Sequence, residues 1–581
     1  MLDEFLIKCG NKTFEPSEYQ KEILHFAKYG VGDAFIQACA GASKTTMLEN
    51  ILYHIPPDDK KLFIAFNKSI SDEMKNRVKD IENVNITTYH SLGYAILREN
   101  LKKEFTIDED KYKNFLRENI TKLTSYEDIE LNNKNYQTYI NNIIHLIEYS
   151  RYYLKSHVIH INKIAEQYNL NLIRDEANVV KKMLEWGKNN TDIIDFTDMV
   201  WLVNEFNLTT KKYLYDIILI DEAQDTSIMQ QEMITKCMKR GTRLFIVGDE
   251  YQSINVWCGS DINAVKKFQS DKCKIFTLPI SYRCAKKIVE LAQRYSPNIV
   301  ASENSPEGEI NYNVPITAPV NNDMVLCRNT APLIECYLKY LKINKKCYIK
   351  GSENISERYI QLINETKSEY IDQSCTTCDG LIPKLYQKLN SYIDLLVSKG
   401  YTIDDAYHHS SVINLYDDII GIITLSDNII NTKDLITKIK DIFKDRSNEG
   451  VMLTTVHKAK GLESENVYIL SPSLLPNKYA KKEWEIKAEE HLTYVAYTRA
   501  KKTLNFMEEN NKYTKLSTTF NFEKMIKIIE KLRVKIKNNS EKNITEKNVN
   551  LETLTPVNNC IEYENTKKIK EKIGNKFKNL F

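Results

Sequence analysis

YDIILI at residues 215–220 runs directly into DEAQDTS at residues 221–227. An apolar run of this length, rich in isoleucine, predicts a strand that is buried on both faces, as in a parallel sheet. Asp221 and Glu222 would then lie at the carboxyl end of the strand, where open α/β sheets bind ligands. Asp221 is placed to hold Mg²⁺ and Glu222 to polarise a water, a pairing that suits phosphoryl transfer. The alternative is a helix N-terminus, because acids there complement the helix dipole.

Length and composition exclude several classes of protein. A chain of 581 residues is too long for one core and should form roughly three or four domains. The formal net charge is only +3, so a nucleic-acid surface would need locally clustered cations. Twelve scattered cysteines favour a reducing compartment over a disulfide framework. With no basic signal-peptide region after Met1 and no apolar run of ~20 residues, we expect a soluble intracellular protein without membrane contact. It would lie in the cytoplasm or nucleoid or, for a viral source, in the host cell and its nucleus.

ACAGASKT at residues 38–45 predicts a phosphate-binding loop. An apolar stretch at 33–37 precedes it and a helical pattern follows, which is the strand–loop–helix context that such a loop requires. Lys44 would reach the β/γ oxygens of a nucleotide, and Thr45 would offer its hydroxyl to Mg²⁺. The pattern is weak alone, but with the acids at 221–222 both halves of one NTP–Mg²⁺ site are present. The nucleotide-binding residues predicted in the loop are Ala38, Cys39, Ala40, Gly41, Ala42, Ser43, Lys44, Thr45 and Thr46.

Ala38 and Ser43 stand where the loop motif has glycine. The N–H of Ser43 can still donate to phosphate, so this departure bears on nucleotide affinity more than on binding itself. Glycine in place of Ser43 should lower strain in the loop, because glycine tolerates backbone angles that serine resists.

Two further strands end in residues that suit a single-strand channel. LFIAF at 62–66 is followed by Asn67, and TTYHSL at 87–92 contains His90. Phe66 could stack on a base, although an isolated Phe is more often a core residue.

A third strand, RLFIVGD at 243–249, leads to a segment that joins polar and aromatic residues. Gln252 is placed to sense a γ-phosphate, and Trp257 follows it by five residues. A base stacked on Trp257 would then be linked through one short segment to the phosphate contact.

The order of these segments resembles the superfamily 1A helicases of the UvrD/Rep type, over roughly residues 14–510. The AFNKS and YHSL segments are similar in sequence to the corresponding motifs of the F-box DNA helicase and of viral or phage UvrD-like helicases. The remaining motifs of the family appear downstream and in order. They are similar to DFTD at 195–198, LPISYR at 278–283, VMLTTVHKAKGLE at 451–463 and YVAYTRA at 494–500.

The resemblance implies an α/β fold with two RecA-like P-loop NTPase core domains, which are parallel sheets flanked by helices. Each core would carry a mainly helical insert. The expected division is a first core at 1–110 and 190–276 with its insert at 111–189, a second core at 277–360 and 441–515 with a short insert at 361–440, and a basic, partly disordered tail at 516–581.

The resemblance also implies roles for single residues. Gln20 would read the adenine, Tyr282 would stack on it and Glu463 would contact the ribose. Arg283 and Arg499 would be arginine fingers that reach the γ-phosphate from the second core, so hydrolysis would need the two cores to close. The implied catalytic residues are Lys44, Asp221, Glu222, Gln252, Arg283 and Arg499, and the implied metal ligands are Thr45 and Asp221.

For DNA, the resemblance implies a track across both cores. UvrD-type relatives commonly have a Tyr and an Arg flanking the tryptophan, whereas this chain has Asn255 and Cys258, so one stacking platform and one cation are missing. The implied DNA-binding residues are Phe66, Asn67, His90, Trp257, Thr455 and His457.

Two segments stay outside the motif pattern. Cys375 and Cys378 suggest zinc, but without a second cysteine pair a solvent-exposed loop is the expected alternative. The C-terminal tail has apolar residues at helical spacing among lysines, which predicts a docking site for a protein partner or nucleic acid, or else a solvated tail.

The sequence therefore predicts an ATP- and Mg²⁺-dependent DNA helicase that moves 3′→5′ on single-stranded DNA and acts at single/double-strand junctions, with its direction taken wholly from the resemblance. It would serve DNA repair, recombination or replication. One alternative is a translocase that displaces bound proteins with little unwinding, which the short second insert would suit. Another is a nucleotide-switched binding module, against which Glu222, Arg283 and Arg499 argue.

Overall fold

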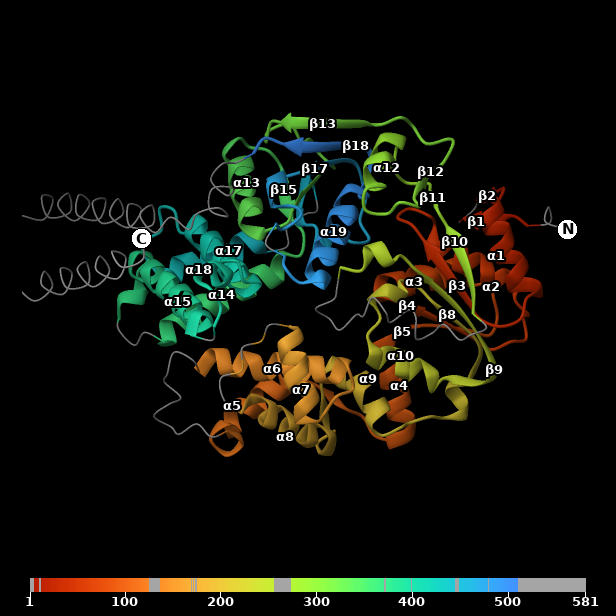
Figure 1. Cartoon of the computed structure of the whole chain (residues 1–581), viewed down its shortest axis with the longest axis horizontal. Helices are drawn as coiled ribbons and strands as arrows, with labels where there is room; N and C mark the ends of the chain where they lie inside the picture. The colour runs from red at the N-terminus through yellow and green to blue at the C-terminus, as the bar shows by residue number, and fades with distance from the viewer. Residues whose placement is uncertain are drawn as a thin grey trace, which may run out of the picture. The chain divides into compact units, whose positions relative to one another are not determined.

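The computed structural model describes residues 5–9, 12–124, 136–168, 170, 172, 175–254, 273–369, 373–398, 400–444, 449–478 and 480–509. The chain divides into two compact units, Met1–Phe520 and Asn521–Phe581, and every described residue belongs to the first. Figure 1 labels many of the strands and helices of this unit. The predicted tail at 516–581 and the predicted DNA contact Trp257 lie outside the described residues.

The first sheet has six parallel strands in the order β10-β3-β9-β8-β4-β5. Its interior strand β8 (Tyr215–Ile220) is the predicted one. Ile217 and Leu219 pack in one apolar cluster, and Ile218 and Ile220 pack in another, because successive side chains of a strand point to opposite faces. The strand is buried on both faces, as predicted. The other strands are β3 (Ala34–Ala38), β4 (Lys61–Ala65), β5 (Val84–Thr88), β9 (Met238–Gly248) and β10 (Lys274–Leu278).

Helices that connect these strands complete the first core. The first of them begins at a capping box, in which Ser17 Oγ accepts from the Gln20 N–H and Gln20 Oε1 accepts from the Ser17 N–H. The elements are α1 (Glu18–Tyr29), α2 (Lys44–His54), α3 (Lys68–Arg77), α4 (Tyr89–Leu101), α9 (Phe196–Glu205) and α10 (Ile228–Thr235), with a hairpin of β1 (Ile7–Cys9) and β2 (Lys12–Phe14) before them.

A first helical segment lies between α4 and α9 in the sequence, and a buried ionic cluster joins it to α9. Arg151 Nη1 lies 2.7 Å from Asp195 and 2.9 Å from Asp198, and Lys111 Nζ lies 2.7 Å from Asp198. The two acids also form the capping box of α9, so two cations fix the start of this helix. The elements of the segment are β6 (Thr106–Ile107), α5 (Lys111–Leu123), α6 (Tyr136–Tyr152), α7 (Val158–Gln167), α8 (Glu176–Asn189) and β7 (Ile193–Ile194), with β6 and β7 paired in parallel.

The second sheet also has six parallel strands, in the order β13-β18-β17-β14-β16-β15. Two such sheets confirm the predicted α/β class. The elements are β11 (Ile280–Ser281), α12 (Lys286–Ala292), β12 (Val300–Ala301), β13 (Glu309–Val314), β14 (Met324–Cys327), α13 (Thr330–Lys342), β15 (Cys347–Ile349), β16 (Val451–Thr455), β17 (Ser464–Ile469), α19 (Glu483–Tyr497) and β18 (Ala500–Met507).

A second helical segment between β15 and β16 shares its core with this sheet. Val325 and Leu453 of the sheet belong to the same apolar cluster as residues of all five helices. The carboxylate of Asp417 accepts hydrogen bonds from the N–H groups of Thr330 and Ala331, at 2.9 and 3.1 Å, and so caps α13. The helices are α14 (Ser352–Glu369), α15 (Cys378–Ser398), α16 (Ile403–Tyr407), α17 (Ser410–Leu425) and α18 (Thr432–Phe443).

Cys375 and Cys378 do not lie in a solvent-exposed loop, so that expectation is wrong. Each is only 2% exposed, because α15 begins at Cys378 and both side chains pack in the apolar cluster of the second helical segment. Within the described residues no group of three or more His, Cys, Asp or Glu side chains could hold a metal ion. In the same part of the chain, no helix is long and apolar enough to cross a membrane.

Candidate active site

The predicted phosphate-binding loop joins β3 to α2 and twice takes a left-handed backbone conformation. Gly41 has a φ of 76° and Ser43 a φ of 62°. This region costs a non-glycine residue about 1–2 kcal/mol, so Ser43 is strained. Its side chain makes no capping hydrogen bond to α2. The side chains of Ala40 and Ala42 are buried, so the loop presents backbone at the N-terminus of α2, where helices favour anions.

Gly41 is in close contact with the segment that carries Tyr282 and Arg283. A Cβ at Gly41 would lie 2.6 Å from the Cβ of Arg283 and 2.7 Å from the Oγ of Ser281. The Gly41 carbonyl accepts a hydrogen bond of 3.0 Å from the Tyr282 N–H. The position therefore requires glycine for both its backbone conformation and its neighbours.

The two predicted carboxylates meet this loop at the end of β8. Thr45 Oγ1 donates to Asp221 Oδ2 over 2.7 Å, and Lys44 Nζ lies 3.1 Å from Glu222 Oε1. Glu222 has a left-handed φ of 50°, so the backbone leaves the extended conformation of the strand at this residue. The structure thus brings the loop and the acids into one cluster, which sequence spacing alone does not require.

Charges within the cluster shift the titration of its acids in opposite directions. Burial, and then the neighbouring charge of Glu222, raise the pKa of Asp221 to about 6. For Glu222, burial is outweighed by Lys44 and Lys460, which lower its pKa to about 2. Glu222 is therefore ionised at neutral pH and stays so well into the acid range. Burial would lower the pKa of Lys44, but Glu222 and two further acids raise it.

Two residues that the sequence reading missed connect these acids to Gln252. Asp249 follows β9, and its Oδ2 accepts from Gln252 Nε2 over 2.6 Å. Gln224 Oε1 accepts from the Asp249 N–H over 3.0 Å, while its Nε2 donates to Glu222. Because β8 and β9 are neighbours, residues after both strands meet at one sheet edge. Polar residues directly after a predicted buried strand were the available signal for Asp249.

Arg283 forms an ion pair with Glu463, 2.6 Å from Nε to Oε2. Lys501 Nζ lies 2.7 Å from the other carboxylate oxygen. Burial would raise the pKa of Glu463, but Lys501 and Arg283 lower it. The predicted finger and the predicted ribose contact are thus close together, and they neutralise each other.

Arg499 is 1% exposed and is held by groups of its own core. Its guanidinium donates to the carbonyls of Val495 and Leu462, at 2.9 and 3.1 Å, and to the hydroxyl of Thr498 at 3.2 Å. Burial, and then the charge of Arg283, lower the pKa of Arg499 to about 10. The structure places this predicted finger against backbone carbonyls of the second core.

The two predicted adenine contacts differ in exposure. The Tyr282 ring is 47% exposed, whereas Gln20 is 5% exposed and its amide oxygen belongs to the capping box of α1. A base could therefore lie on the ring of Tyr282, while Gln20 offers only its amide nitrogen without leaving the cap.

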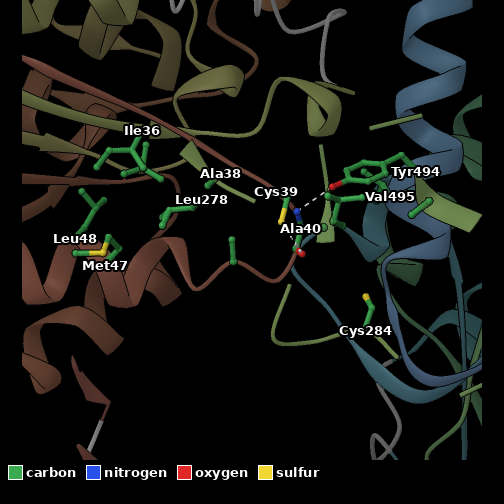
Figure 2. Close-up of a cluster of buried hydrophobic side chains, with 14 of the residues drawn as sticks. Ile36, Ala38, Cys39, Ala40, Met47, Leu48, Leu278, Cys284, Tyr494 and Val495 are labelled. Atoms are coloured by element: carbon green, nitrogen blue, oxygen red, sulfur yellow. Dashed lines mark hydrogen bonds between the residues drawn. The ribbon is translucent and has the colours of Figure 1, made fainter. Parts of the chain in front are cut away.

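Side chains of the second core reach across to the first at several points, two of which lie beside the proposed site. Lys460 donates to the carboxylate of Asp225 and, over 2.6 Å, to the carbonyl of Gln252. The hydroxyl of Tyr494, on α19, accepts a hydrogen bond of 2.9 Å from the Ala40 N–H, as Figure 2 shows. Neither residue could be singled out from the sequence, because both contacts join segments far apart in the chain.

The predicted DNA contacts of the first core lie beside each other at the ends of adjacent strands. Phe66 is 43% exposed after β4, and Asn67 accepts from the Ile70 N–H to cap α3. His90 lies two residues after β5, and burial lowers its pKa. Its ring meets that of Phe196 edge-on, with the centroids 6.2 Å apart. Phe196 is 49% exposed and is an aromatic platform that the residue-by-residue prediction omitted.

In the second core, Thr455 ends β16 and His457 opens the short 3₁₀ turn after it. Burial, and then the charge of Arg328, lower the pKa of His457 to about 3. His457 is therefore a neutral imidazole at physiological pH, able to donate one hydrogen bond from one ring nitrogen and to accept one at the other.

Two family models match the chain. Residues 19–273 match the UvrD/REP helicase N-terminal domain, and residues 384–508 match the viral superfamily 1 RNA helicase core domain. The first match includes the phosphate-binding loop, both acids and Gln252.

Relatives agree with the first match. A probable DNA helicase II homolog of Mycoplasma genitalium is 26% identical over 419 residues, which are 66% of this chain and 56% of that protein. The protein of the same name in Mycoplasma pneumoniae is 28% identical over 311 residues, or 48% of this chain and 42% of that protein. The ATP-dependent DNA helicase PcrA of Staphylococcus aureus is 26% identical over 301 residues, or 48% of this chain and 39% of that protein. The chain spans about half the length of the curated relatives it matches. The similarity of this chain to the first model and to these relatives agrees with its motifs, which resemble the superfamily 1A helicases of the UvrD/Rep type.

Proposed function

We propose that this superfamily 1A chain of the UvrD/Rep type is an ATP-dependent DNA helicase. It would move 3′→5′ on single-stranded DNA, unwind duplex at single/double-strand junctions, and serve DNA repair, recombination or replication. The observation that carries the proposal is the meeting of two motifs at one sheet edge, where Thr45 bonds Asp221 and Lys44 pairs with Glu222. These motifs are 176 residues apart in the chain, so their contact assembles one site.

The donor set at this edge fits Mg²⁺. Hydroxyl and carboxylate oxygens are ligands that Mg²⁺ takes, and the oxygens of Thr45 and Asp221 are 2.7 Å apart. A cation there would favour the ionised form of Asp221, whose pKa burial and the charge of Glu222 raise. When bound, Mg²⁺ would neutralise charge on phosphate oxygens.

Lys44 and Glu222 would carry the chemistry of hydrolysis. Glu222 is ionised at neutral pH, because the charges of Lys44 and Lys460 outweigh burial and lower its pKa, so it can orient a water and accept its proton. Lys44 would bind the β/γ oxygens in exchange for part of its pairing with Glu222. Gln252, hydrogen-bonded to Asp249, would sense the γ-phosphate.

Arg283 and Arg499 would stabilise charge on the phosphate in the transition state. Both cations now have partners in the second core, Glu463 for Arg283 and the carbonyls of Val495 and Leu462 for Arg499. Each would have to exchange these partners for phosphate oxygens. We therefore expect hydrolysis only in a rearranged, closed form of the two cores.

The rest of the nucleotide would contact both cores. Gln20 and Tyr282 would bind the adenine and Glu463 the ribose, and the residues of the loop from Ala38 to Thr46 would surround the phosphates. The four-part division into two cores and two inserts, with its expected boundaries, belongs to the same proposal.

The DNA track would cross both sheets at the ends of their strands. The exposed ring of Phe66 and the pair of His90 and Phe196 support stacking on the first core, since aromatic rings bind bases of any sequence. The proposed track consists of Phe66, Asn67, His90, Phe196, Trp257, Thr455 and His457.

Steady-state ATPase with and without single-stranded DNA tests the enzyme. The wild type should be stimulated by DNA. Glu222→Gln should bind ATP but hydrolyse it slowly, and Lys44→Ala should lose both binding and turnover. The control is Glu232→Gln, which changes an exposed glutamate on α10. Near-normal hydrolysis by Glu222→Gln would refute its catalytic role.

Strand displacement tests direction and coupling. A duplex with a 3′ single-stranded tail should be unwound, and one with a 5′ tail should not. A chain that removes protein from single strands but leaves the tailed duplex intact would instead be a protein-displacing translocase.

A further inference from the structure

The hydroxyl of Tyr494 lies between two loops of the opposite core. It accepts from the Ala40 N–H over 2.9 Å and donates to Asp249 Oδ2 over 3.4 Å. Asp249 follows β9. Ala40 belongs to the phosphate-binding loop, whereas Tyr494 comes from α19 of the second core (Figure 2). One hydroxyl thus connects three elements.

From Asp249 the hydrogen bonds continue to the proposed catalytic acid. The Asp249 N–H donates to Gln224 Oε1, and Gln224 Nε2 donates to Glu222 Oε2. Tyr494, Asp249 and Gln224 are each 2% exposed or less, so water does not replace these partners readily. The chain of contacts runs from α19 to Glu222 without a break.

Packing alone does not account for this hydroxyl. The ring of Tyr494 is fully buried in the apolar cluster of the first sheet and α19, and a phenylalanine ring would fill the same space. The hydroxyl adds a polar group to that cluster, which is favourable because hydrogen-bond partners, Ala40 and Asp249 among them, satisfy it. The hydroxyl therefore holds the Ala40 N–H and the Asp249 carboxylate in place relative to α19.

We propose that Tyr494 is a positioning residue, through which the orientation of the Glu222 carboxylate depends on the docking of α19 against the first core. With α19 in place, its hydroxyl holds Asp249, which holds the Gln224 amide against Glu222. When α19 moves away, Ala40 and Asp249 lose this partner together. The Gln224 amide is then no longer held in place through Asp249. The inference rests on the proposed function, because it concerns the hydrolysis that Glu222 would perform.

Tyr494→Phe tests the proposal, since it removes the hydroxyl and keeps the ring. We expect kcat of the DNA-stimulated ATPase to fall about tenfold, the loss expected when about 1.4 kcal/mol of transition-state stabilisation is removed. The KM for ATP should change less than twofold, because no group proposed to bind the nucleotide is deleted. The matched control is Tyr497→Phe on the same helix, whose ring meets Tyr295 and Phe506 and neither loop of the first core.

A double-mutant cycle separates positioning from a general loss of structure. If the two residues act through one chain of contacts, Tyr494→Phe should cost little further kcat when Gln224→Ala is already present. If the two substitutions lower kcat by factors that multiply in the double variant, the proposal is overturned. A kcat of Tyr494→Phe within twofold of the wild type would also overturn it. Equal losses of kcat and melting temperature in the two Tyr→Phe variants would also overturn it. A wild type without DNA-stimulated ATPase would instead refute the proposed function itself.

Discussion

The guanidinium of Arg283 and the carboxylate of Glu463 form an ion pair, with Nε 2.6 Å from Oε2. The other carboxylate oxygen is 2.7 Å from Lys501 Nζ, so one acid balances two cations. A proposed finger and a proposed ribose contact are therefore already paired within the second core. A nucleotide that takes Glu463 by its ribose hydroxyls would leave Arg283 free to turn to phosphate.

Arg283→Ala should lower the rate of ATP hydrolysis by about 10³ or more, by analogy with other arginine fingers. The physical reason is that a fixed positive charge at the developing phosphate charge stabilises the transition state more than the ground state. Single-turnover hydrolysis measures this effect without product release. Arg294→Ala, an exposed arginine of the same core, is the control. A variant that retains a tenth of the wild-type rate would exclude Arg283 as a finger.

Ser43→Gly should bind ATP at least as tightly as the wild type. The left-handed φ of 62° costs serine about 1–2 kcal/mol that glycine does not pay. Part of this gain is offset by the greater freedom of glycine in the unfolded chain, about 0.5–1 kcal/mol. Nucleotide titration measures the change in ATP affinity, and thermal melting measures the change in stability.

The opposite substitution at the same position sharpens this test. Ser43→Val should weaken ATP binding and lower the melting temperature, because β-branched residues resist left-handed backbone most strongly. A large loss of affinity in Ser43→Gly would show that the serine hydroxyl itself contacts the nucleotide.

His457 should make the folded chain sensitive to acid. Burial, and then Arg328, lower its folded pKa to about 3, whereas an unfolded histidine titrates near ~6.5. Between these values the unfolded chain binds a proton that the folded chain does not. The stability from this site is therefore complete above ~6.5 and is lost as the pH falls towards 3, by about 1.4 kcal/mol per pH unit at most.

His457→Gln should remove this part of the pH dependence. Its melting temperature should fall less than that of the wild type between pH 7 and pH 5, where the wild type loses up to about 2 kcal/mol at this site. His25→Gln, an exposed histidine on α1, serves as the control and should keep the wild-type slope. Equal slopes in all three proteins would mean that His457 titrates in the folded state as it does in the unfolded chain.

Phe66→Ala should weaken binding of single-stranded DNA by roughly tenfold, because stacking on an aromatic ring contributes ~1–3 kcal/mol per base. Fluorescence anisotropy with a labelled oligonucleotide measures the change in Kd. The same loss is expected of Trp257→Ala. Tyr29→Ala removes an exposed ring from α1 and should bind DNA as the wild type does. If all three variants bind alike, the proposed track is wrong.

Contiguous features of the fold could be predicted from the sequence. The strand Tyr215–Ile220 and the loop before α2 each carry their signal within about ten residues, in apolar runs and in loop composition. The capping box at Ser17 is equally local. Short-range sterics and burial decide such elements, so one sequence suffices to find them.

Contacts between segments that are far apart in the chain could not be predicted from the sequence. Tyr494 meets Ala40 across 454 residues, and no pattern at either position records the contact. The carbonyl partners of Arg499 depend on how α19 packs. The sequence predicts an exposed loop at Cys375 and Cys378 because no second cysteine pair follows, yet both side chains are buried in the apolar cluster of the second helical segment. Tertiary packing, rather than local preference, decides these cases.

The cap that Asp417 places on α13 has a consequence for how this chain could be shortened or could diverge. Removing residues 361–440 would leave two N–H groups of α13 without their acceptor and would strip apolar side chains from one flank of the second sheet. Nicking by a protease within these helices should therefore unravel the neighbouring strands instead of releasing a detachable module. Lineages could vary the length of this region at its connecting turns, but they could not delete it without rebuilding the face of the sheet that it covers.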